Sequence, residues 1–112
     1  MSTLKTTARD ATIGPVPEIN GDLDHTTAGE LRKLITTLTL QPGQRLALDL
    51  TGMEFCDSSG ITALIVAHHH ARAAHADVVL ATVPAPTLRV LRMVGLDQIF
   101  PIHPDSDAAT QP

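Results

Sequence analysis

The chain has 112 residues, which fits one domain with a single core, because folding at this length buries roughly two-thirds of the surface that the unfolded chain exposes. Apolar residues make up 43% of the sequence and aromatic residues only 2%, so the core must consist mainly of aliphatic side chains. The formal net charge is -4 and the 8 basic residues form no polybasic run; with so few rings for base stacking, this composition excludes a typical nucleic-acid-binding surface.

Cys56 is the only cysteine, so no disulfide can form within the chain and a reducing compartment is expected. Residues 1–7 are polar and lack the apolar stretch of a secretory signal. No span approaches the roughly 20 apolar residues of a membrane helix. We therefore expect a cytoplasmic protein that does not contact a membrane.

Two strands are predicted at the start of the chain, over residues 4–9 and 12–20. Pro15 and Pro17 interrupt the second of them. Because proline cannot donate a hydrogen bond to a sheet ladder, we expect this strand to lie at an edge or to contain a bulge.

A helix is predicted to begin after Thr27, which together with Glu30 has the form of a capping box. Apolar residues at helical spacing form its inner face: Leu31, Leu34, Ile35 and Leu38. The segment Gln41-Pro42-Gly43-Gln44 ends this helix. Residues 45–51 then alternate with the period of a strand and place three leucines on one side: Leu46, Leu48 and Leu50.

A second helix is predicted from Ser58 or Ser59 to about His75, because residues 61–74 contain no proline or glycine. Four of its residues share the predicted inner stripe: Ile61, Leu64, Ile65 and His68. Residues 78–83 follow as a nearly continuous apolar run, which is typical of a strand covered on both faces.

Pro86 suits the first turn of a third helix and Gly95 suits its left-handed end. Residues 87–94 are therefore predicted to be helical, with Leu88 and Leu91 facing inward. A last short strand is predicted over residues 98–102. The polar segment that follows is expected to be a loose tail.

The predicted order is β-β-α-β-α-β-α-β, which implies a mixed sheet with helices packed against it. We predict one α/β domain over residues 1–102, followed by the polar tail over residues 103–112. No internal repeat is found in the sequence.

Polar side chains concentrate where the strand over residues 45–51 leads through a loop into the second helix. At a helix start, several backbone N–H groups lack partners and the macrodipole is positive, so a phosphate on Ser58 gains about 0.3–1 kcal/mol. It also brings roughly -1.5 to -2 charges at pH 7 beside Asp57, which favours an outward-pointing phosphate. A partner surface that accepts a neutral hydroxyl would then lose roughly 3–4 kcal/mol, or several hundredfold in affinity.

The same residues allow a purely structural interpretation. Either Asp57 or Ser58 acts only as the N-cap of the helix, and Gly60 only permits close packing. The residue string alone does not separate this interpretation from a phosphorylation site.

Three segments, in this order and at these spacings, resemble the STAS family of anti-sigma factor antagonists: Gly21 to Ala28, Leu48 to Ile61 and Leu88 to Leu96. The second contains Asp57-Ser58-Ser59-Gly60, and together the segments span about residues 4–102. The resemblance implies a STAS-like domain with a four- or five-stranded mixed sheet and helices mainly on one face. This fold agrees with the element order predicted independently.

The resemblance further implies that Ser58 is phosphorylated by an anti-sigma factor that is itself an ATP-dependent serine kinase. The unphosphorylated antagonist binds this kinase and frees a sigma factor, and a separate serine phosphatase restores it. Five residues are implied to lie on or shape the partner-binding surface: Asp24, Thr26, Asp57, Ser59 and Gly60. ATP belongs to the kinase, so no cofactor is expected in this chain.

Two features depart from the family. The Gly-Pro-Val-Pro stretch over residues 14–17 interrupts what should be a regular second strand. The chain also ends where many members continue into a longer carboxy-terminal helix. The second departure leaves part of one sheet face less covered, which is compatible with a homodimer or simply with a smaller domain.

Four histidines suggest metal ligands: His68, His69, His70 and His75. Consecutive helical residues point about 100° apart, and no two of these stand at i, i+4, so we expect a solvated helix end and no metal site.

An enzyme would need Ser58 or Cys56 as a nucleophile with His25 or His103 as its base, and nothing in the sequence fixes such a triad. Phosphate-loop and dinucleotide fingerprints are also absent from the sequence, so we expect no enzymatic activity and no catalytic residue. Cys56 is expected to be a buried small residue with a raised pKa and little reactivity. Among binding modules, the open alternative is a constitutive docking subunit in which Ser58 only caps a helix.

Overall fold

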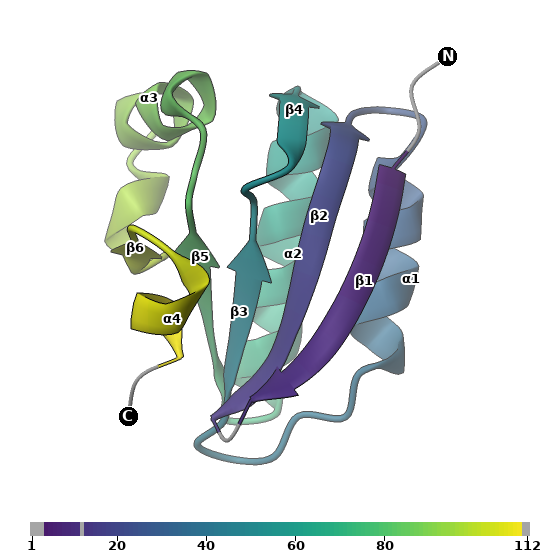
Figure 1. Ribbon diagram of the computed structural model, residues 1–112, viewed down its shortest axis with the longest axis vertical. Coiled ribbons are helices and arrows are strands. Elements are labelled where there is room, and N and C mark those ends of the chain that lie inside the picture. Colours follow the sequence, from purple (N-terminus) through teal and green to yellow (C-terminus); the bar gives the residue numbers. More distant parts are fainter. Residues whose placement is uncertain (1–3, 12, 111–112) are drawn as a thin grey trace.

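The computed structural model describes residues 4–11 and 13–110, in which strands and helices alternate along most of the chain (Figure 1). The strands are β1 Leu4–Ala11, β2 Gly14–Leu23, β3 Arg45–Asp49, β4 Met53–Cys56, β5 Asp77–Ala81 and β6 Ile102–His103. The helices are α1 Ala28–Thr37, α2 Ser58–Ala73, α3 Ala85–Met93 and α4 Ser106–Ala109, with a 3-10 turn, η1, over Leu96–Gln98.

Five strands lie side by side in the order β1-β2-β3-β5-β6, and β4 pairs with β2 beyond the end of β3. β1 runs antiparallel to β2, and the other pairings of the described residues are parallel. The carboxyl ends of the parallel strands therefore point to one end of the molecule, where α3 and the start of α2 also lie (Figure 1). A single α/β domain with a five-stranded row confirms the predicted fold class.

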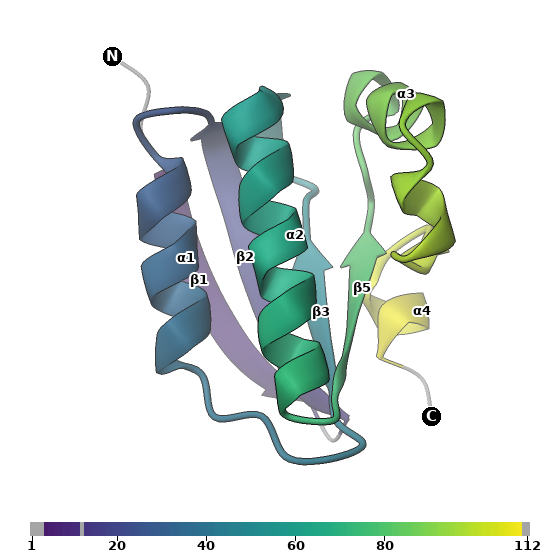
Figure 2. The same ribbon diagram turned by 180° about the vertical axis from the view of Figure 1, so that it is seen from behind.

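Helices α1 and α2 lie next to each other on one face of the sheet (Figure 2). The main core between them and the strands is built from aliphatic side chains and Phe100. The alternation predicted for β3 is confirmed, because all three leucines are fully buried in this core: Leu46, Leu48 and Leu50. No helix in the described part of the chain is long and apolar enough to cross a membrane.

Strand β5 is covered on both faces, as predicted. Val78 and Leu80 join the core under α1 and α2, whereas Val79 and Ala81 belong to a second buried cluster. That second cluster includes Ala109 of α4, which lies on the opposite face of the sheet.

Strand β2 was predicted to lie at an edge or to contain a bulge. It is an interior strand, so the edge position is wrong, whereas its pairing with β4 shifts register between Gly21 and Asp22, away from the prolines. Its register with β1 is unbroken through both prolines, with Ala8↔Pro17 and Asp10↔Pro15 in pairs. Since proline has no N–H, the nitrogens of both prolines must face away from β1 and toward β3. Between β2 and β3 the ladder is short: among the described residues, Glu18↔Asp49 is the one pair in register. By comparison, β3 and β5 share five pairs.

Strand β4 was not predicted, and it exists because the chain turns sharply after β3. The backbone N–H and the hydroxyl of Thr51 both donate to Asp49 Oδ1, at 3.0 and 2.6 Å. The chain then resumes its path along β2, with Met53 opposite Gly21. The last predicted strand, over residues 98–102, is misplaced, because η1 ends at Gln98 and the strand itself is Ile102–His103.

The segment predicted as a loose tail is packed against the domain over residues 103–110. Ala109 is fully buried against small and branched side chains of three strands: Val16, Ala47, Val79 and Ala81. Arg45 Nη1 donates a hydrogen bond to the Ala109 carbonyl at 2.9 Å, and Asp105 Oδ1 accepts one from the N–H of Ala108 at 2.8 Å. Residues 111–112 of the predicted tail lie outside the described residues, as does Thr12 of the predicted second strand.

We predict that Ala109→Asp lowers the free energy of unfolding by about 2–4 kcal/mol, because it buries a charge where the partners are apolar. Urea denaturation followed by far-UV circular dichroism measures this change. Asp107→Asn, on an exposed position of the same helix, is the matched control and should change the value by less than about 0.5 kcal/mol. Equal midpoints for Ala109→Asp and the wild type would mean that α4 adds nothing to the stability of the domain.

Candidate functional site

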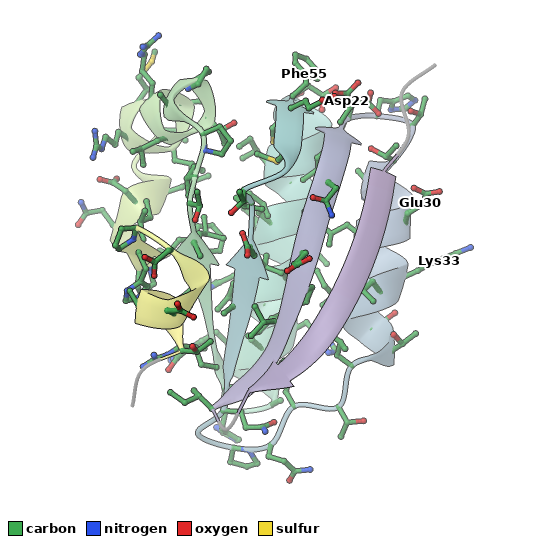
Figure 3. All side chains as sticks on the ribbon, viewed as in Figure 1. Asp22, Glu30, Lys33 and Phe55 are labelled. Carbon is green, nitrogen blue, oxygen red and sulfur yellow. The ribbon has the colours of Figure 1, made fainter. Side chains whose placement is uncertain are left out.

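The residues singled out around Ser58 lie at the end of the domain where the parallel strands finish. β4 leads into α2 through Asp57, and the loop over residues 24–27 connects β2 to α1 beside it. Asp22 of β2 and Phe55 of β4 are paired in register and lie together at this end (Figure 3). The fold therefore brings together the two segments that the sequence assigns to one surface.

Asp57 holds these two segments together. Its Oδ1 accepts a hydrogen bond from the N–H of Gly60 at 3.1 Å, so Asp57 is the N-cap of α2. Its Oδ2 accepts one from the N–H of His25 at 3.3 Å, and its own N–H donates to the Leu23 carbonyl at 3.2 Å. The interpretation of Asp57 as an N-cap is confirmed, and the same carboxylate also positions the neighbouring loop.

Asp24 organises that loop from within. Its Oδ1 accepts hydrogen bonds from the N–H and the hydroxyl of Thr26, at 3.0 and 2.7 Å, and from the N–H of Thr27 at 3.2 Å. The buried Thr27 hydroxyl donates to the Asp22 carbonyl at 2.8 Å and accepts from the N–H of Asp24 at 2.9 Å. The predicted capping box of Thr27 and Glu30 is therefore wrong: this hydroxyl is used inside the loop and makes no cap bond to α1.

Gly60 allows α2 to approach β2 and β4 closely. A Cβ atom at this position would lie 2.5 Å from the Leu23 carbonyl oxygen and 2.7 Å from Cys56 Sγ, so a larger residue requires the backbone to move. Cys56 is half-buried beside this contact. Burial, and secondarily the Asp57 carboxylate, raise the pKa of its thiol from 9.0 to about 12, which confirms the predicted raised pKa.

Ser58 is the first residue of α2, and its side chain is exposed. Across the loop, His25 and Thr26 are also exposed, whereas Asp24 and Ser59 are half-buried. The Ser58 hydroxyl therefore lies at the positive end of the helix macrodipole, where a large partner can reach it without any rearrangement of the core.

A groove of about 540 Å³ runs between α2 and α3, with Ser58 on its rim. Its apolar lining comes from both helices and from η1: Ile61, Ile65, Val90, Val94 and Leu96. The prediction of one buried stripe on α2 is only partly right. Leu64 is fully buried, but Ile61, Ile65 and His68 are half-buried, and the two isoleucines form a wall of the groove.

Two side chains that line this groove are exposed: Val90 of α3 is 44% exposed and Val94, just after α3, is 61% exposed. Elsewhere on the surface, Met93 is 79% exposed beside the second hollow and Phe55 of β4 is 54% exposed. Sequence reasoning assigned no function to them, although α3 carries more apolar residues than its inward positions require. Clustered exposed apolar side chains of this kind are typical of a protein–protein contact.

The histidines of α2 gather no metal site in the part of the chain that the structure describes, where no group of three or more His, Cys, Asp or Glu could hold an ion. The His68 ring meets Phe100 edge to face, with ring centroids 5.7 Å apart. Burial, followed by the nearby His69 and Arg72, lowers the pKa of His68, so this ring favours its neutral form and packs as part of the helix.

Solved structures of other proteins share this fold. An anti-sigma factor antagonist from Mycobacterium paratuberculosis superposes with a TM-score of 0.79 over 96% of this chain and 91% of its own, at 27% sequence identity. The unphosphorylated anti-sigma factor antagonist SpoIIAA matches with a TM-score of 0.64 over 90% and 88% of the two chains, at 22% identity. A sulfate transporter family protein from Wolinella succinogenes matches with a TM-score of 0.73 over 85% and 80%, at 18% identity.

The sequence pattern of the STAS domain matches residues 6–109, so this chain belongs to the STAS domain family. Within that family it has the fold of the anti-sigma factor antagonists, which confirms the resemblance found in the sequence. The match to the Wolinella succinogenes protein shows that the same fold also occurs in a sulfate transporter family protein.

We predict that Asp57→Ala lowers the free energy of unfolding by about 0.5–2 kcal/mol, since it removes the N-cap of α2. The loop over residues 24–27 should also exchange its amide hydrogens faster, because the N–H of His25 loses its acceptor. Glu54→Ala on the exposed side of β4 is the control. Unchanged exchange in this loop would contradict the role of Asp57 as the link between the two segments.

We predict that Cys56 in the folded protein reacts with iodoacetamide far more slowly than the same residue in concentrated urea. A pKa of about 12 instead of 9.0 leaves about a thousandfold less thiolate at about pH 8. Intact mass measured over time gives both rates. Similar rates in the two states would show that the thiol is neither buried nor held neutral.

Proposed function

We propose that this protein is an anti-sigma factor antagonist whose binding to its anti-sigma factor is switched off by phosphorylation of Ser58. One observation carries this proposal: an exposed serine hydroxyl begins α2 on the rim of an apolar groove. The partner is a serine kinase that uses ATP. The unphosphorylated antagonist binds it and frees a sigma factor, and a serine phosphatase reverses the modification.

In this proposal Ser58 is a substrate, and the chain itself is not an enzyme. Ser58 Oγ attacks the γ-phosphorus of the kinase-bound ATP, ADP leaves, and the hydroxyl proton passes to a base of the kinase. The antagonist contributes a hydroxyl held at a fixed place, since Asp57 anchors the first turn of α2 through Gly60.

In this proposal the phosphate on Ser58 lies beside the Asp57 carboxylate, whose like charge opposes it, while the start of α2 favours it by only about 0.3–1 kcal/mol. Both oxygens of the Asp57 carboxylate accept backbone N–H bonds, which holds this side chain in place beside Ser58. The phosphate therefore stays on the surface, where it opposes docking of a partner that fits a neutral hydroxyl. A penalty of roughly 3–4 kcal/mol corresponds to several hundredfold weaker binding.

The five proposed partner-binding residues divide into two groups. Thr26 is exposed and Asp24 and Ser59 are half-buried, so these three can contact the partner directly. Asp57 and Gly60 act by shaping the surface, because the Asp57 carboxylate is engaged in the loop and cap bonds and Gly60 is buried.

We predict that Ser58→Ala binds the cognate anti-sigma kinase like the wild type, whereas Ser58→Asp binds it at least about tenfold more weakly. Calorimetry with the purified kinase measures both affinities. Thr36→Asp, which adds the same charge at an exposed position of α1, is the control and should bind normally.

Incubation of the wild type with kinase and ATP should add one phosphate by intact mass, and Ser58→Ala should add none. Equal affinity of the Ala and Asp variants, with no phosphate added by any kinase that binds, would remove the switch. The domain would then be a constitutive docking subunit.

A further inference from the structure

Strand β4 contains one residue more than the stretch of β2 with which it pairs. Met53 lies opposite Gly21, and Phe55 lies opposite Asp22. Because one step along β2 corresponds to two steps along β4, Glu54 is an extra residue and forms a β-bulge. In a regular strand, Met53 and Phe55 would face the same side. Met53 is buried in the core under α1 and α2, whereas Phe55 is 54% exposed, so the bulge turns Phe55 out of the core.

An exposed ring stands out in this chain, which contains two phenylalanines and no tyrosine or tryptophan. The other ring, Phe100, is fully buried in the core. Phe55 lies on the face of the sheet away from α1 and α2, since the next residue, Cys56, packs against the core. A bulge re-aims a side chain, and exposed aromatic rings are favoured as anchors of protein interfaces. The bulge therefore presents Phe55 for contact with another molecule.

Two carboxylates accompany this ring. Asp22 is its partner across the ladder and lies beside it in Figure 3, and the exposed Glu54 precedes it in the bulge. Within residues 4–11 and 13–110, neither carboxylate forms an ion pair. A partner that covers the ring therefore gains from positive charge beside its contact surface.

Strand β4 leads directly into the Ser58 segment. Ser58 follows Phe55 by three positions, which limits the distance between their Cα atoms to about 11 Å. A stable protein interface covers about 800 Å² on each partner. A kinase that holds the Ser58 hydroxyl therefore comes within reach of the ring.

We propose that Phe55 is the aromatic anchor through which this protein binds its anti-sigma kinase, a proposal that rests on the function proposed for the Ser58 surface. The kinase receives the ring in an apolar pocket and places a basic side chain at the rim of that pocket, where it meets Asp22 and Glu54. Removing the exposed part of the ring from water supplies binding energy, and the carboxylates fix the orientation of the partner.

The test measures, by calorimetry, how tightly the full chain binds the kinase that phosphorylates Ser58. Phe55→Ala removes the ring, and a double variant, Asp22→Asn with Glu54→Gln, removes both charges and keeps the side-chain shapes. The matched control is Met93→Ala, which truncates a 79% exposed apolar side chain on α3. Urea denaturation first establishes that each variant keeps a midpoint close to that of the wild type.

We expect Phe55→Ala to bind about tenfold or more weakly, and Met93→Ala to bind within about twofold of the wild type. The charge variant should bind about threefold or more weakly. Its affinity should also change less than that of the wild type when salt is raised from about 50 to about 500 mM.

A fluorine label reports the contact directly. The chain grown with 4-fluorophenylalanine carries one fluorine on Phe55 and one on Phe100, and Phe55→Leu assigns the two resonances. Saturating unlabelled kinase should shift the Phe55 resonance and leave that of the buried Phe100 in place. An unmoved Phe55 resonance would show that the ring stays outside the interface and would overturn the inference.

Binding of Phe55→Ala within about twofold of the wild type also overturns the inference, even if Ser58→Asp abolishes binding. Equal weakening by Met93→Ala overturns it too, because any loss of exposed apolar surface would then explain the effect. Loss of a dimer of this chain in Phe55→Ala, with unchanged kinase affinity, would assign the ring to a second copy instead. If Ser58→Asp binds normally while Phe55→Ala fails, the switch is wrong and the anchor stands; if no kinase binds the wild type, both are overturned.

Discussion

The geometry of this end of the domain depends on one carboxylate. Asp57 caps the first turn of α2 with one oxygen and holds the N–H of His25 with the other. A backbone bond from the Asp57 N–H to the Leu23 carbonyl joins the Ser58 segment to the end of β2 as well. A side chain that spans two elements in this way turns two surface loops into one defined surface.

The tight contact at Gly60 complements this link. Because α2 lies so close to the Leu23 carbonyl, the first turn of the helix has little room to shift inward. In the proposed switch, a change of charge at Ser58 would therefore stay at the surface. An apolar groove lined by Ile61, Ile65, Val90 and Val94 lies beside it.

Much of the fold and the position of the candidate site could be predicted from the sequence, because the clearest sequence patterns reflect local structure. Alternation over residues 45–51 predicted β3, and the run without proline or glycine over residues 61–74 predicted α2. The Asp57-Ser58-Ser59-Gly60 string pointed to the candidate site, which lies at the start of α2. The misses arose where a tertiary contact decided the outcome. Thr27 bonds within the loop instead of capping α1, and the short α4 is held by the burial of Ala109.

The prolines of β2 show the same limit. The sequence showed that these two prolines lack an N–H donor. The neighbouring strand that each proline nitrogen faces depends on the pairing of β2 with β1, which cannot be inferred from a local sequence pattern. The groove also escaped prediction, since Ile61 and Ile65 have the spacing of core residues. Only the position of α3 decides that they border a hollow.

The two ends of the described chain leave the domain in opposite directions. β1 begins opposite Gly21, close to the Ser58 surface, whereas α4 finishes against Arg45 at the far end of β3. A sensor chip or a fluorescent reporter coupled behind α4 would leave the Ser58 surface open to solvent. The same attachment in front of β1 would crowd it, so the point of immobilisation matters for any affinity measured with this domain.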